Sequence, residues 1–365
     1  MADNIVASAL PVTGDYTQQV SLQFKATTPD QLPEIVSFLS GVFGASPDSP
    51  NLARNLLAWK YYDVGPEWSG SRSYALRKGD LLAAHTGIWP IRLATRSGTV
   101  QALQAVDWAG ARDVPGAGAS LMNRLRKLAP VLITVGGSPD TRRALPAMGF
   151  KTCGAMEVYA RVLRPWLQFR TRPFDGPRAF PRLLRNALWS RSPVAQSHGW
   201  TCQPSVHPDS DMLARFGEQS RDYPESRHST GFIEYLLKCP AAKVSYFELS
   251  NLGQKSGYFV LSRAGGQIRL ADLRILSEKT TDWVAAYAVA VDAASRDPKG
   301  CEVIARASTS VSRQALEANG FRARGNLPVF VLDPGKALGE FDSIALGMLD
   351  DDSLYLNDPA SPYCT

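Results

Sequence analysis

A glycine-rich turn in the first third of the chain is the segment best suited to bind an anion. Gly116 and Gly118 stand in PGAGASLMNRLRKLA, residues 115–129, where the turn runs directly into an amphipathic helix. Glycines let the backbone approach a ligand closely, and the first turn of a helix offers N–H groups at the positive end of its dipole. The pattern indicates a phosphate or similar anion as ligand, and it equally suits a plain tight turn.

Cysteine and histidine do not form a metal-ligand pattern. The five cysteines are scattered without a CxxC pair, and the four histidines have no ligand spacing with one another or with cysteine. We therefore expect no metal site and no disulfide framework, and the odd cysteine count fits a reducing cytoplasm. Cys153 has no base near it in the sequence and is not a candidate nucleophile.

The elements that must position the glycine-rich turn occur in an order that is repeated. The first pass predicts strands at 20–26, 72–78, 81–89, 99–107, 131–135 and 153–163, and helices at 31–43, 50–62, 115–129 and 140–148. The second pass predicts strands at 200–206, 243–249, 256–263, 267–274, 301–305 and 327–332, and helices at 209–217, 230–238, 282–296 and 311–319. The turn lies between the fourth strand and the third helix of the first pass.

One short motif marks the repeat most clearly. Residues 138–151 and 309–322 share a helix that ends in Gly-Phe followed by a basic residue, and they superpose after a shift of 171 positions. Gly149 and Gly320 then take the place of the left-handed residue that follows a helix. We predict a mixed α/β fold in two tandem copies, each a largely antiparallel sheet flanked by helices.

The repeat divides the 365 residues into five parts. We predict a flexible tail at 1–19, an N-terminal domain at 20–163, a linker at 164–199, a C-terminal domain at 200–335 and a C-terminal tail at 336–365. A chain of this length is longer than one core usually supports. The last part is acidic, and we expect it to be loose.

An arginine-rich segment separates the two copies. Residues 161–191 contain eight arginines and one acid, Asp175, with Trp166, Phe169, Phe174, Phe180 and Trp189 interleaved. One interpretation is an interfacial segment that contacts anionic lipid headgroups. The other is a connector whose arginines pair with acids of the second copy. No nucleic-acid-binding motif accompanies the charge, which disfavours a nucleic-acid partner.

The order of elements, the Gly-x-Gly turn and the Gly-Phe helix ending resemble the GNAT superfamily of acyl-CoA-dependent N-acyltransferases. Two such units in one chain resemble the tandem arrangement of Fem-type aminoacyl transferases and of GNAT-like proteins associated with polysaccharide biosynthesis. The sequences AWKY at 58–61 and YALRKGDLLAAHTG at 74–87 are similar to the latter group. The resemblance covers nearly the whole chain outside the tails and the arginine-rich linker.

The resemblance implies a site for the pyrophosphate of acetyl-CoA or another acyl-CoA in the N-terminal copy. The residues that match the family's loop, or can supply its charge, are Arg112, Gly116, Ala117, Gly118, Ala119 and Ser120. Asp113 replaces the basic residue with which the family's loop begins, and Arg112 can compensate from one position earlier. The second copy has ILSEKTTDW at 275–283 in this place, without glycines.

The resemblance also implies a carboxylate base near the fourth strand and a tyrosine acid on the closing helix. Asp107 is the base candidate, and Asp272 occupies the like position in the second copy, so the pair also fits a structural feature of the duplicated fold. The tyrosine is replaced by Leu145. Tyr159 and Glu157 on the following strand are the candidate substitutes, on a face that also fits the core.

An acceptor would lie between the early helices and the sheet. Trp59, Tyr61, His85 and Trp89 are the candidate acceptor-binding residues. Aromatic residues at such positions are more often part of the core, and a histidine in a strand is more often buried and hydrogen-bonded than a ligand contact.

The resemblance thus implies a cytoplasmic N-acyltransferase that uses acyl-CoA and modifies an amine, such as an amino sugar or another surface-polysaccharide precursor. Two alternatives stand beside it: a degenerate GNAT pair that binds or scaffolds, and a Fem-type aminoacyl transferase. The chain shows no signal peptide and no run of 18 apolar residues, so we expect membrane contact, if any, to be peripheral at the inner face.

Overall fold

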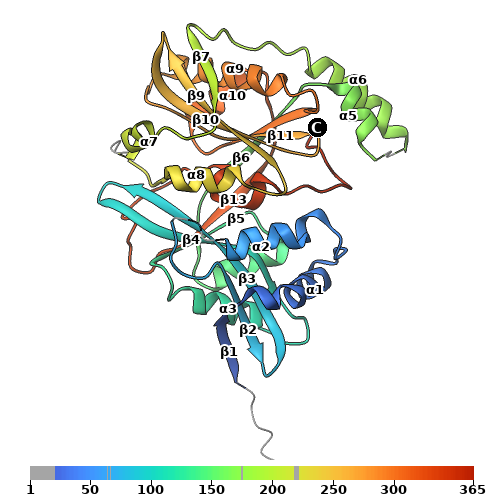
Figure 1. Ribbon diagram of the computed structural model, residues 1–365, viewed down its shortest axis with the longest axis vertical. Coiled ribbons are helices and arrows are strands. Elements are labelled where there is room, and N and C mark those ends of the chain that lie inside the picture. Colours follow the sequence, from blue (N-terminus) through green and yellow to red (C-terminus); the bar gives the residue numbers. More distant parts are fainter. Residues whose placement is uncertain (1–20, 64, 66, 174–175, 218–221) are drawn as a thin grey trace, which may run out of the picture.

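The computed structural model describes residues 21–63, 65, 67–173, 176–217 and 222–365, and Figure 1 shows their arrangement. The predicted flexible tail at 1–19 lies outside these residues, as do Phe174 and Asp175 of the arginine-rich segment. The first copy occupies one end of the long axis and the second copy the other.

The first copy follows the predicted order of elements. Its helices and strands are β1 (Leu22–Ala26), η1 (Pro29–Gln31), α1 (Leu32–Phe43), η2 (Pro50–Leu52), α2 (Arg54–Tyr62), β2 (Ser73–Lys78), β3 (Leu81–Thr95), β4 (Gly98–Gly110), α3 (Ala117–Leu125), β5 (Val131–Val135), α4 (Pro139–Ala147) and β6 (Lys151–Val162). Strands β3 and β4 form a longer hairpin than predicted, because alternating polar residues after position 89 continue the pairing to Thr95 and Gly98.

The second copy repeats this order after a helical hairpin. The connecting elements are α5 (Pro165–Thr171), η3 (Gly176–Arg178) and α6 (Ala179–Trp189). The remaining elements are β7 (Trp200–Ser205), α7 (Ser210–Gly217), β8 (Glu225–Arg227), α8 (Thr230–Leu237), β9 (Lys243–Asn251), β10 (Gln254–Ala264), β11 (Gln267–Ile275), α9 (Thr280–Ser295), β12 (Glu302–Ala307), α10 (Ser310–Ala318), β13 (Arg322–Leu332), η4 (Met348–Asp350) and η5 (Asp352–Leu354).

The repeated motif folds in the same way in both copies. Gly149 and Gly320 are left-handed, with φ of 90° and 76°. The amide of the following phenylalanine donates to a leucine carbonyl in each copy, Phe150 to Leu145 and Phe321 to Leu316, at 3.1 Å in both cases. The duplication inferred from this motif is therefore confirmed in its local geometry.

Among the described residues, all thirteen strands belong to one mixed sheet, which confirms the predicted fold class. The strand order is β1-β2-β3-β4-β5-β13-β6-β12-β11-β10-β9-β7, and β8 pairs separately with β3. The last strand of the second copy, β13, lies between β5 and β6 of the first copy. Strand β6 in turn pairs with β12 of the second copy. The two copies therefore exchange their last strands. Because the sheet runs through both copies, the predicted domain boundaries stay a prediction.

Helices cover both faces of the sheet. Around the first copy, Leu121 and Leu145 from α3 and α4 pack on one face, and Leu39 and Leu57 from α1 and α2 pack on the other. Around the second copy, α9 and α10 pack on one face, while α7, α8 and the C-terminal segment form a central core with α2 and β3. Burial on both faces explains why several strands read as continuous apolar runs.

The C-terminal segment is packed, so the expectation that it is loose was wrong. Leu349 and Leu354 are fully buried in the central core, and Trp89 Nε1 donates to the Leu349 carbonyl at 2.8 Å. Buried Glu302 accepts from the amides of Cys364 and Thr365 at 2.7 and 3.1 Å. The apolar residues between the acids, rather than the acids, decide where this segment lies.

Candidate functional site

A cleft opens in the second copy where two parallel strands part. β11 and β12 pair only over residues 267–270 and 302–305, after which β11 continues to Ile275 paired with β10 alone and β12 stays paired with β6. The gap forms a cleft of about 400 Å³. Most of its lining comes from β11 (270–274), α9 (Trp283, Tyr287), the start of α10 (308–312) and the C-terminal segment (343, 345–348), and Tyr223, Glu225, Glu278 and Arg306 complete it.

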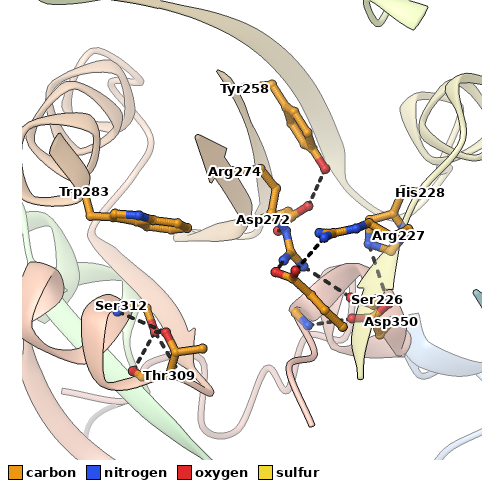
Figure 2. A network of polar contacts seen from close by, with 12 residues as sticks. Ser226, Arg227, His228, Tyr258, Asp272, Arg274, Trp283, Thr309, Ser312 and Asp350 are labelled. Atoms are coloured by element: carbon orange, nitrogen blue, oxygen red, sulfur yellow. Dashed lines mark hydrogen bonds and ion pairs between the residues drawn. The ribbon is translucent and has the colours of Figure 1, made fainter. Parts of the chain in front are cut away.

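Asp272 lies on one wall of this cleft within a polar network. Tyr258 Oη donates to Asp272 Oδ2 at 2.8 Å, and Arg274 Nε donates to Oδ1 at 3.0 Å (Figure 2). Arg274 also pairs with Glu225, which in turn binds Arg227 at 2.7 Å. Burial lowers the pKa of Arg274, but the carboxylates of Asp272 and Glu225 outweigh burial and raise it overall. The hydrogen bonds from Tyr258 and Arg274 thus fix the orientation of the Asp272 carboxylate at the cleft wall.

The local backbone explains why Asp272 takes this position. The register of β10 and β11 shifts between Val260 and Leu261, which places an extra residue, Ala271, immediately before Asp272. A bulge of this kind re-aims the side chains next to it. On the neighbouring strand β10, position 257 requires glycine, because a Cβ there would lie 2.2 Å from the Arg274 carbonyl oxygen.

A buried histidine and carboxylate lie beside this network. His228 Nε2 is 3.5 Å from Asp350 Oδ1, and Figure 2 places both next to Arg227. Burial lowers the pKa of His228 and raises the pKa of Asp350, so burial favours the neutral form of each. Asp350 Oδ2 accepts from the Gly347 amide at 2.5 Å, which fixes the C-terminal segment against the cleft.

The opposite wall carries a helix N-terminus. Thr309 caps α10, accepting from the Ser312 amide at 3.2 Å, and the Ser312 hydroxyl accepts from the Thr309 amide. Figure 2 shows this pair and Trp283 facing the Asp272 network. The cleft therefore has a carboxylate and guanidinium wall opposite a wall of hydroxyls and an indole ring.

In the first copy, Asp107 lies in a similar polar network. Asp107 has a left-handed backbone, with φ of 50°, at a register shift between β3 and β4. Tyr61 Oη donates to Asp107 Oδ2 at 2.5 Å, and Lys60 Nζ lies 2.6 Å from the same oxygen and 3.2 Å from Asp352 Oδ2. Burial would raise the pKa of Asp107, but the Lys60 ammonium and the Tyr61 hydrogen bond act together against burial, and the pKa is lowered overall. Both predicted residues, Asp107 and Tyr61, therefore share one site.

The other acceptor candidates are buried. His85 is fully buried, its Nε2 lies 2.9 Å from Ser73 Oγ, and burial lowers its pKa to about 4. Trp59 stacks on Tyr235 with ring centroids 4.5 Å apart, and Trp89 is fully buried in the same central core. These three side chains are therefore part of the core, which was the alternative to acceptor binding that the sequence left open.

The predicted anion-binding turn has the expected backbone. Gly116 is left-handed, with φ of 79°, and a Cβ there would meet open space. Trp108 Nε1 donates to the Gly118 carbonyl at 3.0 Å, and a Cβ on neighbouring Gly110 would lie 3.0 Å from the Gly118 amide. The Ser120 amide already donates to Gly116. Close helix–strand packing therefore favours glycine at position 110, whereas a Cβ on Gly118 would make only an ordinary contact with Trp108. A role for Arg112 and residues 116–120 in anion binding stays a prediction.

The predicted substitutes for the missing tyrosine form a separate group. Tyr159 Oη lies 2.9 Å from both Glu157 Oε2 and Glu317 Oε1, and Arg313 lies 3.2 Å from Glu157. Glu317 and Arg313 come from α10 of the second copy. They reach Tyr159 and Glu157 because β6 pairs with β12. The structure therefore brings Asp107 and Tyr61 together in one place, and Tyr159 and Glu157 together in another.

Two partners in these sites escaped the sequence analysis. Lys60 lies inside the AWKY motif between the candidates Trp59 and Tyr61, and its partner Asp352 is 292 positions away. The cleft network around Arg274 depends on β8, a three-residue strand without a recognisable pattern. The one usable signal was the repeat, which pointed to Asp272 as the counterpart of Asp107.

Comparisons with known structures define the class of fold. The chain is similar to a GCN5-related N-acetyltransferase from Anabaena variabilis ATCC 29413, with a TM-score of 0.56 and 9% identity over 86% of this chain and 73% of that one. It is similar to a tandem GNAT protein from the clavulanic acid biosynthesis pathway, with a TM-score of 0.53 and 11% identity over 86% and 99%. It is also similar to Saccharomyces cerevisiae N-myristoyltransferase with bound myristoyl-CoA, with a TM-score of 0.56 and 12% identity over 90% and 81%.

These similarities show the fold: a mixed α/β sheet of the GNAT type, repeated in tandem. No family model matches the chain, and the comparison with curated protein sequences found no match.

Proposed function

We propose that the chain is an acyl-CoA-dependent N-acyltransferase whose reaction centre is the cleft of the second copy. One observation carries this proposal: the strands β11 and β12 part beside a bulged Asp272 and open about 400 Å³ that protein side chains do not fill. At the corresponding position of the first copy, Asp107 already contacts Tyr61 and Lys60, and Lys60 also contacts Asp352. The activities in the names of the structural neighbours are consistent with this chemistry by analogy of fold.

The residues at the mouth of the cleft fit the ends of an acyl-CoA. Exposed Lys279 precedes the first turn of α9, next to Glu278 in the cleft lining, so an ammonium and a helix N-terminus are available for phosphates. The acid in that turn, Asp282, accepts from the Ser277 hydroxyl. When bound, acyl-CoA would supply an activated thioester carbonyl. Trp283 and Tyr287 contribute aromatic rings to the lining.

The chain's own residues would act mainly by positioning the amine. Asp272, held by Tyr258 and Arg274, offers a fixed carboxylate to an incoming ammonium group and accepts its proton as the amine becomes nucleophilic. Glu225 adds a second carboxylate to the lining. We propose a polar primary amine as acceptor, such as an amino sugar of the kind used in surface polysaccharides, because the cleft wall is charged and hydroxyl-rich.

The test separates the two copies. Calorimetric titration with acetyl-CoA and CoA is compared for the parent chain, Ser308→Trp in the cleft lining and Ala119→Glu at the N-terminal turn, with circular dichroism as a check of folding. We expect Ser308→Trp to abolish binding and Ala119→Glu to leave it unchanged. The reverse result would move the cofactor to the N-terminal turn, and no binding by the parent chain would refute an acyl-CoA enzyme.

A second candidate function is acyl-CoA binding without transfer. The specific observation that favours it is that both aspartates at the strand ends already have ionic partners, Asp272 with Arg274 and Asp107 with Lys60. Mass-spectrometric detection of acylated glucosamine distinguishes the two. We expect Asp272→Asn to lower turnover by about 100-fold or more with acyl-CoA binding retained, as for loss of a general base. A binding module would show no product from the parent chain.

A further inference from the structure

The helical hairpin of α5 and α6 carries a continuous apolar stripe on the outside of the molecule. Trp166, Phe180, Leu184 and Leu188 are 60–67% exposed, which is rare for large apolar side chains. The last three are four residues apart along α6 and therefore share one face of that helix. Figure 1 shows the hairpin at the side of the second copy, outside the sheet and its covering helices.

Aromatic contacts join the two helices into one surface. The rings of Trp166 and Phe169 stack at 5.6 Å, and those of Phe169 and Phe180 meet at 5.7 Å. Beside them lies a groove of about 260 Å³, lined by Pro165, Phe169 and Leu183 among others. The apolar side chains thus form a contiguous surface rather than isolated exposed residues.

The arginines of the segment divide into two sets. Arg161 and Arg164 face inward and donate to backbone carbonyls: Arg161 to Ser192 and Asn319, and Arg164 to Asp297 and Gly300. These contacts, together with a buried hydrogen bond from Asn186 to Gln168 at 2.8 Å, fix the hairpin to the second copy. A structural connector would need only this inward set.

The second set faces outward. Arg170, Arg178 and Arg191 are exposed, and among the described residues no carboxylate forms an ion pair with Arg170 or Arg178. Arg185 and Arg324 both lie over the ring of Trp189, at 4.4 and 5.4 Å. Arg185 also donates to Asn186 Oδ1 and Arg324 to the Cys364 carbonyl, so these two arginines are held in place beside the stripe. Positive charge therefore borders the apolar stripe.

We propose that this hairpin docks on the anionic surface of a lipid bilayer, with Trp166, Phe180, Leu184 and Leu188 entering the headgroup boundary and Arg170 and Arg178 contacting lipid phosphates. An amphipathic helix with a bulky apolar face and cationic borders has the form of an interfacial segment. No helix within the described part of the chain is long and apolar enough to cross a bilayer, so the contact is made from the surface. The inference is independent of the reaction proposed for the cleft.

The experiment is co-sedimentation of the full chain with vesicles of phosphatidylcholine alone or mixed with phosphatidylglycerol, at low and high salt. We expect binding to the anionic vesicles only, weakened by salt. Arg170→Gln with Arg178→Gln should weaken binding about 30-fold, at roughly fivefold for each arginine. Phe180→Ser with Leu184→Ser and Leu188→Ser should weaken it by about tenfold or more, since buried apolar area is lost.

The control variants carry Arg→Gln and Leu→Ser changes at exposed positions outside the hairpin. Arg124→Gln with Arg126→Gln removes two charges near the end of α3, and Leu252→Ser removes another exposed leucine. Both should bind vesicles like the parent chain, and circular dichroism verifies the fold of every variant. The proposal is overturned by absent binding, by equal binding to neutral vesicles, or by equal loss in the controls. A stripe-dependent dimer in light scattering, without vesicle binding, would also overturn it and assign the stripe to a second copy of the chain.

Discussion

Replacing Lys60 with methionine should destabilise the chain, because two partly buried carboxylates now share this one buried cation. Lys60 is 2% exposed, and its ammonium lies 2.6 Å from Asp107 and 3.2 Å from Asp352. Methionine preserves most of the aliphatic stem, so packing changes little. The carboxylates then face each other without a counter-charge, and loss of one partner of a buried ion pair costs about 3–5 kcal/mol.

Urea unfolding, followed by tryptophan fluorescence and circular dichroism, measures this cost as a change in the free energy of unfolding. A matched surface change, Arg296→Met, breaks an ion pair with Asp292 that is 72% and 60% exposed, and should cost no more than about 0.5 kcal/mol. The triple variant Lys60→Met, Asp107→Asn and Asp352→Asn removes all three charges and should recover about 2 kcal/mol or more of the loss.

The free energy of unfolding measured at acid pH tests the same ion pair independently. Burial raises the pKa of Asp107, but Lys60 and the Tyr61 hydrogen bond together lower it, so its pKa is lowered overall. The stability from this pair is therefore present above the ordinary carboxylate pKa and is lost as pH falls through the lowered one. In Lys60→Met the loss should begin at higher pH. The proposed role of the ion network would be refuted if Lys60→Met were as stable as the parent chain. It would also be refuted if the triple variant were no more stable than Lys60→Met.

Three further changes test other parts of the structure. The His85→Gln variant should lose less stability than the parent chain as pH falls from 6.5 to 4. The folded pKa of His85, about 4, lies below the ordinary 6.5, and this difference costs the parent chain about 3 kcal/mol over that interval. An unchanged pH dependence of the free energy of unfolding in urea would contradict this. Gly116→Ala should lower the free energy of unfolding by about 1 kcal/mol because of its φ of 79°, whereas Gly118→Ala in α3 should be neutral or stabilising; equal losses would argue against the observed turn. Leu354→Ala should cost about 2–5 kcal/mol in the same assay because Leu354 is fully buried; a negligible loss would restore the idea of a loose C-terminal segment.

Most of the local structure could be predicted from the sequence because its signals are local. Strand β5 at 131–135 was predicted at its observed bounds, and α1 within one residue. The Gly-Phe helix endings could be predicted because a left-handed C′ residue favours glycine wherever the helix lies. Helix α5 was missed because it is short and lies between prolines, where the pattern indicated an irregular linker.

The sites were harder to predict because their partners are distant in sequence. Asp107 was identified from its place at a strand end, but nothing in periodicity indicates that Lys60 and Asp352 converge on it. The acidic composition of the C-terminal segment suggested exposure, although Asp352 is held by a buried cation and Asp350 lies beside His228. Composition describes an average over a segment, whereas burial depends on single residues.

The exchange of last strands gives the C-terminal segment its place at both sites. Because β13 pairs with β5 of the first copy, the chain leaves the sheet at Leu332 next to the first copy and must cross back over the central core. On that path Asp352 reaches Lys60 in the first copy, while Ala345 and Gly347 line the cleft of the second. A change at one site is therefore transmitted to the same short segment that borders the other. Two complete, side-by-side domains would not have this connection, since each would end in its own sheet.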